Sequence, residues 1–205
     1  MTDGIHPNLR HLPFGRQVEA RHDFTEWGPF PFDVPGPLPL RVLAQPTAEE
    51  PPRKGEAGPG ECWNCGRADE DYLWTDEHWR LTSLREASAS PAVVLLEPRA
   101  HVDLDTLPPE LAAQLGPMMQ RVERAVLGIG GVGRVHVTRW GDGVAHLHWW
   151  FLARPQGVAQ MRGAFMAQWD DLLPAIPEQQ WRANLASIAA SMAEAGGTAH
   201  AKLEG

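Results

Sequence analysis

His146-Leu147-His148-Trp149-Trp150-Phe151-Leu152 alternates between polar and apolar side chains in a way that indicates a β-strand. Because successive residues of a strand point to opposite faces, we expect His146 and His148 on one face and Trp149 on the other. A lone histidine in a strand is usually a hydrogen-bonded core residue. Two of them on one face, after the turn Gly141-Asp142-Gly143, favour a functional site.

The segments around this strand predict an α+β domain with a mostly antiparallel sheet. Strands are expected at 72–74, 79–84, 92–97, 135–140 and 146–152. A central helix is expected from 106 to 126, where apolar residues recur at helical spacing. Two C-terminal helices, at 158–173 and 178–195, are separated by Pro174 and Pro177.

The N-terminal part of the chain has a different composition. Residues 1–61 hold eleven of the nineteen prolines and no helical apolar period, which excludes long helices there. Within them, residues 44–60 carry no aliphatic side chain larger than alanine, so a linker or mobile loop is expected. The predicted organisation is therefore a proline-rich arm and linker (1–61), a core domain (62–155) and a C-terminal helical extension (156–205).

Length and charge exclude several classes of protein. A chain of 205 residues can bury a core without disulfides, and two cysteines rule out a disulfide-rich secreted scaffold. The net charge of −8 argues against binding of a nucleic acid polymer, although a nucleotide remains open as a small ligand. No apolar run approaches the roughly 20 residues of a membrane span, and the N-terminus shows no signal segment. We expect a cytoplasmic protein with no membrane partner.

The pair Cys62-Trp63-Asn64-Cys65 has the spacing of half a zinc site. Two thiolates three residues apart reach one tetrahedral ion from a single tight turn, which Gly66 assists. A redox pair and two unremarkable thiols are the alternatives, but no thioredoxin-like βαβ context surrounds the motif. Among nine histidines, those held most rigidly are expected to be His101, directly after a strand, and the pair at 146 and 148.

Two motifs together resemble the histidine-triad (HIT) superfamily. The segment from Val93 to Leu104, which contains Glu97-Pro98-Arg99-Ala100-His101, looks like the family's strand-Pro-basic-x-His segment. The segment from His146 to Phe151 resembles its His-x-His-x-His signature strand. The match covers about residues 62–155 and implies a HIT-like fold.

The resemblance also implies roles for particular residues. In some HIT proteins, and in the related galactose-1-phosphate uridylyltransferase branch, a structural zinc is held at the positions that are Cys62, Cys65, His101 and His146 here. The middle signature histidine, His148, corresponds to the nucleophile that attacks the α-phosphorus of a nucleotide derivative. Relatives of this kind are commonly homodimers.

The sequence departs from the family pattern at the third signature position. Trp150 stands where hydrolases have histidine and the transferase branch has glutamine, and an indole donates one hydrogen bond but cannot accept one or carry a proton. The turn before the signature, residues 141–145, lacks the Gly-Gln-Ser/Thr motif that helps to bind phosphate in typical members of the family. Arg139 is a candidate replacement, and His136 is a further candidate if its strand neighbours that of His148.

Two functions follow from these observations. One is a HIT-like nucleotide hydrolase or nucleotidyltransferase that acts through His148, with altered or reduced activity because of Trp150. The alternative is a non-catalytic nucleotide-binding or protein-interaction module on a zinc-stabilised HIT scaffold. Retention of His148 favours the enzyme and Trp150 favours the module, and the sequence does not identify the substrate.

Overall fold

The computed structural model describes residues 7–36 and 38–200, and its chain divides into two compact units, residues 1–52 and 53–205. The elements of the second unit are β1 (Trp74–Thr75), β2 (Trp79–Ser83), β3 (Val93–Pro98), α1 (Pro109–Gly128), β4 (Val132–Thr138), β5 (Trp149–Pro155), α2 (Met166–Leu172), α3 (Glu178–Glu194) and β6 (Thr198–Ala199). The predicted α+β class is confirmed.

The strands form one sheet in the order β4-β5-β3-β2-β1-β6, and every neighbouring pair is antiparallel. The register places Trp150 of β5 between Leu95 of β3 and Thr138 of β4. The strand that follows the two histidines therefore lies inside the sheet, with paired strands on both sides.

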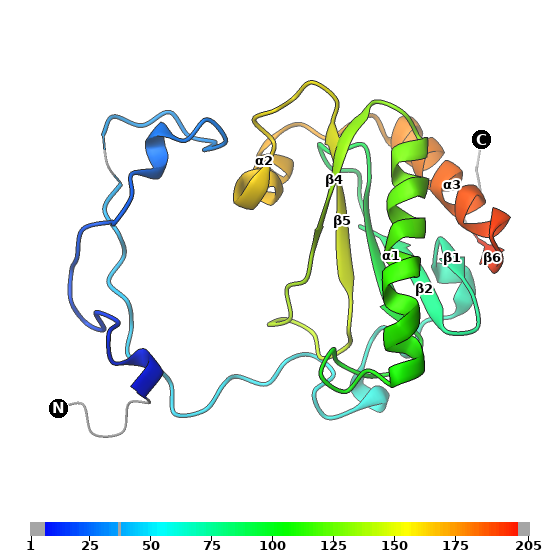
Figure 1. Ribbon diagram of the computed structural model, residues 1–205, viewed down its shortest axis with the longest axis horizontal. Coiled ribbons are helices and arrows are strands. Elements are labelled where there is room, and N and C mark those ends of the chain that lie inside the picture. The colour runs from blue at the N-terminus through cyan, green and yellow to red at the C-terminus, as the bar shows by residue number, and fades with distance from the viewer. Residues whose placement is uncertain (1–6, 37, 201–205) are drawn as a thin grey trace. The chain divides into compact units, whose positions relative to one another are not determined.

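The two faces of the sheet are covered differently. Helices α1 and α3 contact each other and pack on one face, over a core that includes Trp79, Leu96 and Phe151 (Figure 1). The predicted orientation of Trp149 toward this core is confirmed. On the other face, α2 packs near β5 over a smaller cluster around Leu152 and Met166. The remainder of that face is where the histidine site forms.

The first unit carries two short 3-10 helices, Pro7–Leu9 and Phe24–Glu26. Two backbone segments of this unit are joined by hydrogen bonds, from Gly15 N to Leu43 O at 2.8 Å and from Gln17 Nε2 to Leu40 O at 2.8 Å. In the described part of the chain, no helix combines the length and the apolar character needed to cross a bilayer.

Several boundaries differ from those predicted. The division between the units falls after Pro52, so residues 53–61 belong with the core rather than with the arm. Strand β5 begins at Trp149, which leaves both histidines in the segment that leads into it. The expected helix from 158 begins only at Met166, because Gly163, inside the expected range, adopts a positive φ of 61° that a helix does not contain.

Candidate metal centre and histidine cavity

Four side chains from three separate parts of the second unit converge on one point. Cys62 and Cys65 lie on a turn before β1, His101 follows β3, and His146 precedes β5. One ligand atom from each of the four lies within 4.8 Å of all the others. This is the set that the sequence predicted, and its donor types, two thiols and two imidazoles, are those of a closed structural zinc site.

The distances between the ligand atoms fit a tetrahedral ion. Cys62 Sγ and Cys65 Sγ each lie 3.5 Å from His146 Nδ1, and Cys65 Sγ lies 3.4 Å from His101 Nδ1. A zinc ion binds sulfur at about 2.3 Å and nitrogen at about 2.0 Å, and at a tetrahedral angle the sulfur and nitrogen atoms are then about 3.5 Å apart. The residues therefore fit a structural zinc ion without rearrangement.

Backbone carbonyls hold both histidine rings in the orientation that a metal needs. His101 Nε2 donates to Gly55 O at 3.1 Å, and His146 Nε2 donates to Pro98 O at 2.8 Å. A carbonyl only accepts, so each bond places the proton on Nε2 and leaves the Nδ1 lone pair directed at the thiols. Burial lowers the pKa of His146 to about 4, which keeps its ring neutral at pH 7.

The turn that carries the two cysteines rests on a buried ion pair. Asn64, between the cysteines, donates to Glu97 Oε2 at 2.8 Å, and Tyr72 donates to Glu97 Oε1 at 2.9 Å. Arg80, itself buried, lies 3.2 Å from the same carboxylate. Burial raises the pKa of Glu97, and Arg80 opposes that shift as the nearest positive charge. The carboxylate thus links the cysteine turn to strands β2 and β3.

Gly55 brings the chain into close contact with the metal centre. Its φ is +78°, and a Cβ built there would lie 3.1 Å from Cys62 Cβ. Only glycine takes this conformation at so close an approach without strain. The carbonyl of the same residue accepts the hydrogen bond from His101. The segment at 53–61 therefore supports the centre directly, although its composition predicted a linker.

His148 lies beside the metal centre and faces a cavity. Its Nδ1 is 2.8 Å from the carbonyl oxygen of His146, its side chain is buried, and it lines a hollow of about 760 Å³. We call this hollow the His148 cavity. Its walls are Lys54, Trp63, Asn64, Arg67, Asp71, Thr82, Ser83, Leu84, Arg85, Leu95, Glu97, Val144, His148 and Trp150.

Trp150 stands next to His148 in this cavity, as the alternation of the strand predicts. The centres of the two rings are 6.2 Å apart, and the Trp150 ring lies 5.6 Å from that of Trp140. The buried Nε1 of Trp150 has no hydrogen-bond acceptor among the described residues. The third signature position therefore presents an aromatic surface and one donor, with no group that accepts a proton.

Arg139 and His136, the other predicted substrate-binding residues, do not line the cavity. Arg139 pairs with Asp103, which also binds Arg53 at 2.5 Å. His136 stands opposite Leu152 in the register of β4 and β5, and burial lowers its pKa. His136 belongs to β4 and Arg139 follows it, and the structure assigns neither of them to the walls of the His148 cavity.

Sequence reasoning missed the cationic residues of the cavity. Lys54 comes from the segment assigned to the linker, and Arg67 and Arg85 come from loops without a recognisable motif. Arg67 stacks on the exposed ring of Trp63 at 4.6 Å, and Arg85 lies 5.1 Å from the same ring. One signal for these arginines was present in the sequence. Trp63 lies between the two cysteines, so its ring belongs to the cysteine turn, and both arginines contact that ring.

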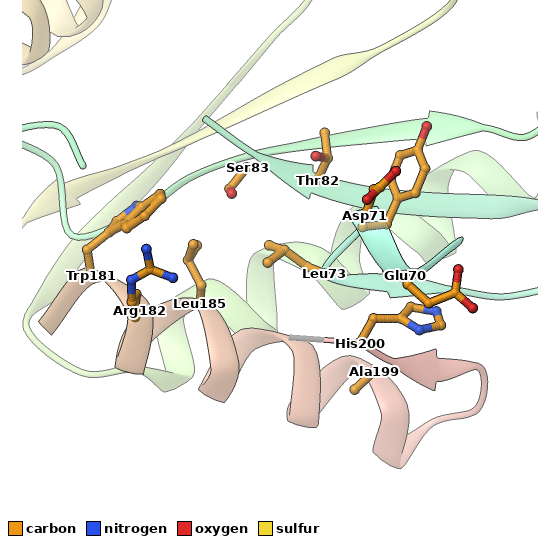
Figure 2. A pocket seen from close by; sticks show the side chains of 11 residues that line it. Glu70, Asp71, Leu73, Thr82, Ser83, Trp181, Arg182, Leu185, Ala199 and His200 are labelled. Carbon is orange, nitrogen blue, oxygen red and sulfur yellow. The ribbon is translucent and has the colours of Figure 1, made fainter. Parts of the chain in front are cut away.

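A second cavity, of about 570 Å³, lies between α3 and the β1–β2 hairpin. Figure 2 shows Trp181, Arg182 and Leu185 projecting from α3 toward Leu73 and Ser83, with His200 near Glu70. The His200 ring lies 2.8 Å from the Thr75 hydroxyl. This cavity contains neither His148 nor a metal ligand, so the chemistry predicted from the sequence belongs to the His148 cavity.

Comparison with known proteins gives matches in structure only. No protein-family model matches the sequence, and no curated protein matches it either. A zinc-bound histidine triad family protein from Mycobacterium smegmatis is 22% identical, with 67% of this chain and 99% of that chain covered and a TM-score of 0.48. A hypothetical histidine triad nucleotide-binding protein from Sulfolobus tokodaii is 12% identical, with 65% of this chain and 93% of that chain covered and a TM-score of 0.48.

A uridylyltransferase structure is also similar, at 21% identity and a TM-score of 0.45, with 66% of this chain and 46% of that chain covered.

Proposed function

We propose that the His148 cavity binds a nucleotide-like phosphate compound and that His148 attacks its phosphorus. The observation that carries this proposal is the hydrogen bond between His148 Nδ1 and the carbonyl oxygen of His146. Since the carbonyl can only accept, the proton sits on Nδ1 and the lone pair on Nε2. A neutral imidazole held in this tautomer is a competent nucleophile near pH 7.

The reaction proceeds in two displacements at phosphorus. In the first, Nε2 of His148 forms a bond to phosphorus while the bond to the leaving group breaks. The ring keeps its Nδ1 proton and becomes positively charged, and the His146 carbonyl stabilises that charge. In the second, water or an acceptor hydroxyl displaces the histidine and releases the free ring.

Trp150 sets the limit on this chemistry. A leaving alkoxide or amine needs a proton, and the indole cannot supply one. We infer that the leaving group is protonated by solvent, so poor leaving groups depart slowly. The activity is therefore altered or reduced relative to a complete triad, as the sequence predicts.

The metal centre has a supporting role in this proposal. Cys62, Cys65, His101 and His146 would hold a zinc ion that stabilises the fold around the cavity. With four protein ligands the ion has no open position for substrate. The two thiols are free in the structure, which suits a reducing compartment, and we propose the cytoplasm.

The test is a search for phosphohistidine. The protein is incubated with nucleoside phosphoramidates and dinucleotides labelled at the α-phosphorus, and wild type is compared with His148→Ala and with His136→Ala as a histidine control. We expect acid-labile label on wild type and His136→Ala only. Imidazole added to His148→Gly should restore turnover in part.

The alternative, a non-catalytic binding module, is favoured by Trp150, which lacks a proton-accepting group. Saturable nucleotide binding by both wild type and His148→Ala, with no phosphohistidine in wild type, would establish the module and overturn the catalytic proposal.

A further inference from the structure

The His148 cavity is cationic in a protein whose overall charge is −8. Three basic residues line it, namely Lys54, Arg67 and Arg85, against two carboxylates, those of Asp71 and Glu97. The Glu97 carboxylate is already paired with Arg80 at 3.2 Å. A local excess of positive charge inside an acidic protein attracts anionic ligands to that cavity.

The basic groups differ in what they already bind. The Arg67 guanidinium donates to Thr82 Oγ1 at 3.1 Å and to the Asp71 carbonyl, and it lies 4.1 Å from the Tyr72 ring centre. Arg85 is placed against Trp63. The Lys54 ammonium, by contrast, has no partner among the described residues. Its three donors are available to a ligand.

The backbone of Lys54 is fixed although its side chain is exposed. Lys54 N donates to Gly143 O at 3.1 Å and Lys54 O accepts from Ala145 N at 2.9 Å, which forms a parallel bridge between Lys54 and Val144. Residues paired in a bridge point to the same side, and both of these line the cavity.

The neighbours of Lys54 are anchored as well. Arg53 donates to Gly141 O at 3.1 Å and pairs with Asp103 at 2.5 Å. Gly55 O accepts from His101 Nε2 at 3.1 Å. The lysine is therefore held beside the loop 141–145, the one that lacks the phosphate-binding residues of the family pattern.

We propose that Lys54 is the residue that binds the phosphate of the ligand in the His148 cavity, replacing the contacts that the loop 141–145 does not provide. This inference rests on the proposed function for the identity of the ligand as a phosphate compound. Arg139, the replacement expected from the sequence, is committed to Asp103. An ammonium on a flexible stem serves as a point charge for a phosphate that moves from substrate to histidine.

The chain offers an unusually direct test, because Lys54 and Lys202 are its only lysines. Protein labelled with ¹³C in lysine gives two side-chain signals, which the variant Lys202→Arg assigns. Inorganic phosphate and AMP should each shift the Lys54 signal saturably and leave that of Lys202 in place, and adenosine should shift neither. Equal movement of both signals, or no movement with phosphate and AMP, would overturn the proposal.

Affinity measurements by calorimetry give a second test. Lys54→Gln keeps a polar side chain but removes its charge, and we expect AMP to bind at least about tenfold more weakly. Lys54→Arg should recover most of that loss, and Lys202→Gln should bind as wild type does. Zinc content and thermal unfolding should be unchanged in all three, because Lys54 holds the fold through its backbone.

The two proposals fail in different ways. If the Lys54 signal responds to phosphate while no phosphohistidine forms, the catalytic proposal is wrong and the anion site stands. If Lys54→Gln forms phosphohistidine and binds AMP as well as wild type does, the lysine has no such role and the catalytic proposal stands.

Discussion

His148 Nδ1 and the carbonyl oxygen of His146 are 2.8 Å apart, so the candidate nucleophile is oriented by the backbone of a candidate metal ligand. The His146 ring in turn is held by Pro98 O and by its position against the two thiols. Any change that moves His146 therefore changes the direction in which His148 Nε2 points. The metal centre and the cavity are mechanically one unit.

The leaving group determines how strongly Trp150 reduces the rate of cleavage. Because no proton donor stands at the third signature position, we expect wild type to cleave substrates with acidic leaving groups, such as p-nitrophenol, far faster than those with alkylamines. Trp150→His should raise the rate with alkylamine substrates by about 10²-fold or more and change the p-nitrophenyl rate little. Steady-state kinetics with a graded leaving-group series measures this, and equal effects on both ends of the series would contradict it.

Loss of a thiol should release the metal and loosen the fold. Burial raises the pKa of the Cys65 thiol to about 11, so only a bound ion keeps it as a thiolate at neutral pH. We expect Cys65→Ser to lose zinc and to lower the free energy of unfolding by about 3 kcal/mol or more. Metal analysis and urea denaturation check both. Zinc retained in full by Cys62→Ser/Cys65→Ser would show that these residues are not ligands.

Gly55→Ala should damage the metal centre through backbone geometry. The residue needs its φ of +78°, and the new Cβ would lie 3.1 Å from Cys62 Cβ. Gly130→Ala is a matched control, since Gly130 has the same φ of 78° but no atom within 4 Å of a built Cβ.

We expect about 1 kcal/mol of destabilisation for Gly130→Ala and about 2–4 kcal/mol, with weaker zinc binding, for Gly55→Ala. Thermal unfolding and competition with a zinc chelator measure the difference. Equal effects of the two variants would show that the contact with Cys62 is unimportant.

Asp69 should contribute to stability only above acidic pH. Hydrogen bonds from Arg99 at 2.7 and 2.6 Å hold the pKa of the Asp69 carboxyl below its ordinary value. This stabilisation is present above the ordinary pKa and is lost as the pH falls through the lowered one. Because both side chains are partly exposed, Asp69→Asn should cost no more than about 1 kcal/mol at pH 7.

The difference in free energy of unfolding between Asp69→Asn and wild type should shrink toward pH 3 and in high salt. Urea denaturation at several pH values and salt concentrations measures it. A difference that grows toward low pH would contradict the ion pair.

The sequence predicted the parts of the site that depend on local spacing. Cys62 and Cys65 share one turn, and His146 and His148 alternate with apolar residues, so their relative positions follow from the backbone alone. That the cysteines, His101 and His146 form one metal site could be predicted only from the family resemblance, because these residues lie on segments that are distant in the chain. Homodimer formation, which is common among the relatives and which this sequence does not decide, is not addressed by the fold of the single chain.

The contribution of residues 53–55 could not be predicted in this way. Their support of the site comes from a backbone bridge to residues 143–145 and from one glycine carbonyl. A single backbone bridge is too short to produce a periodic pattern of side chains. The run that contains it is rich in proline and glycine, which is the composition of a linker. The pairing of Arg139 with Asp103 was equally hidden, since it joins two loops.

The spread of the metal ligands along the chain has a consequence for folding. Cys62 and His146 are separated by 84 positions, and both must be in place before an ion can be enclosed. During synthesis the cysteine turn leaves the ribosome long before the last ligand, so the ion is captured only after β3 and α1 have been made. Once captured, it closes a long loop of the chain, and opening that loop again requires either release of the ion or unfolding of the strands that flank it.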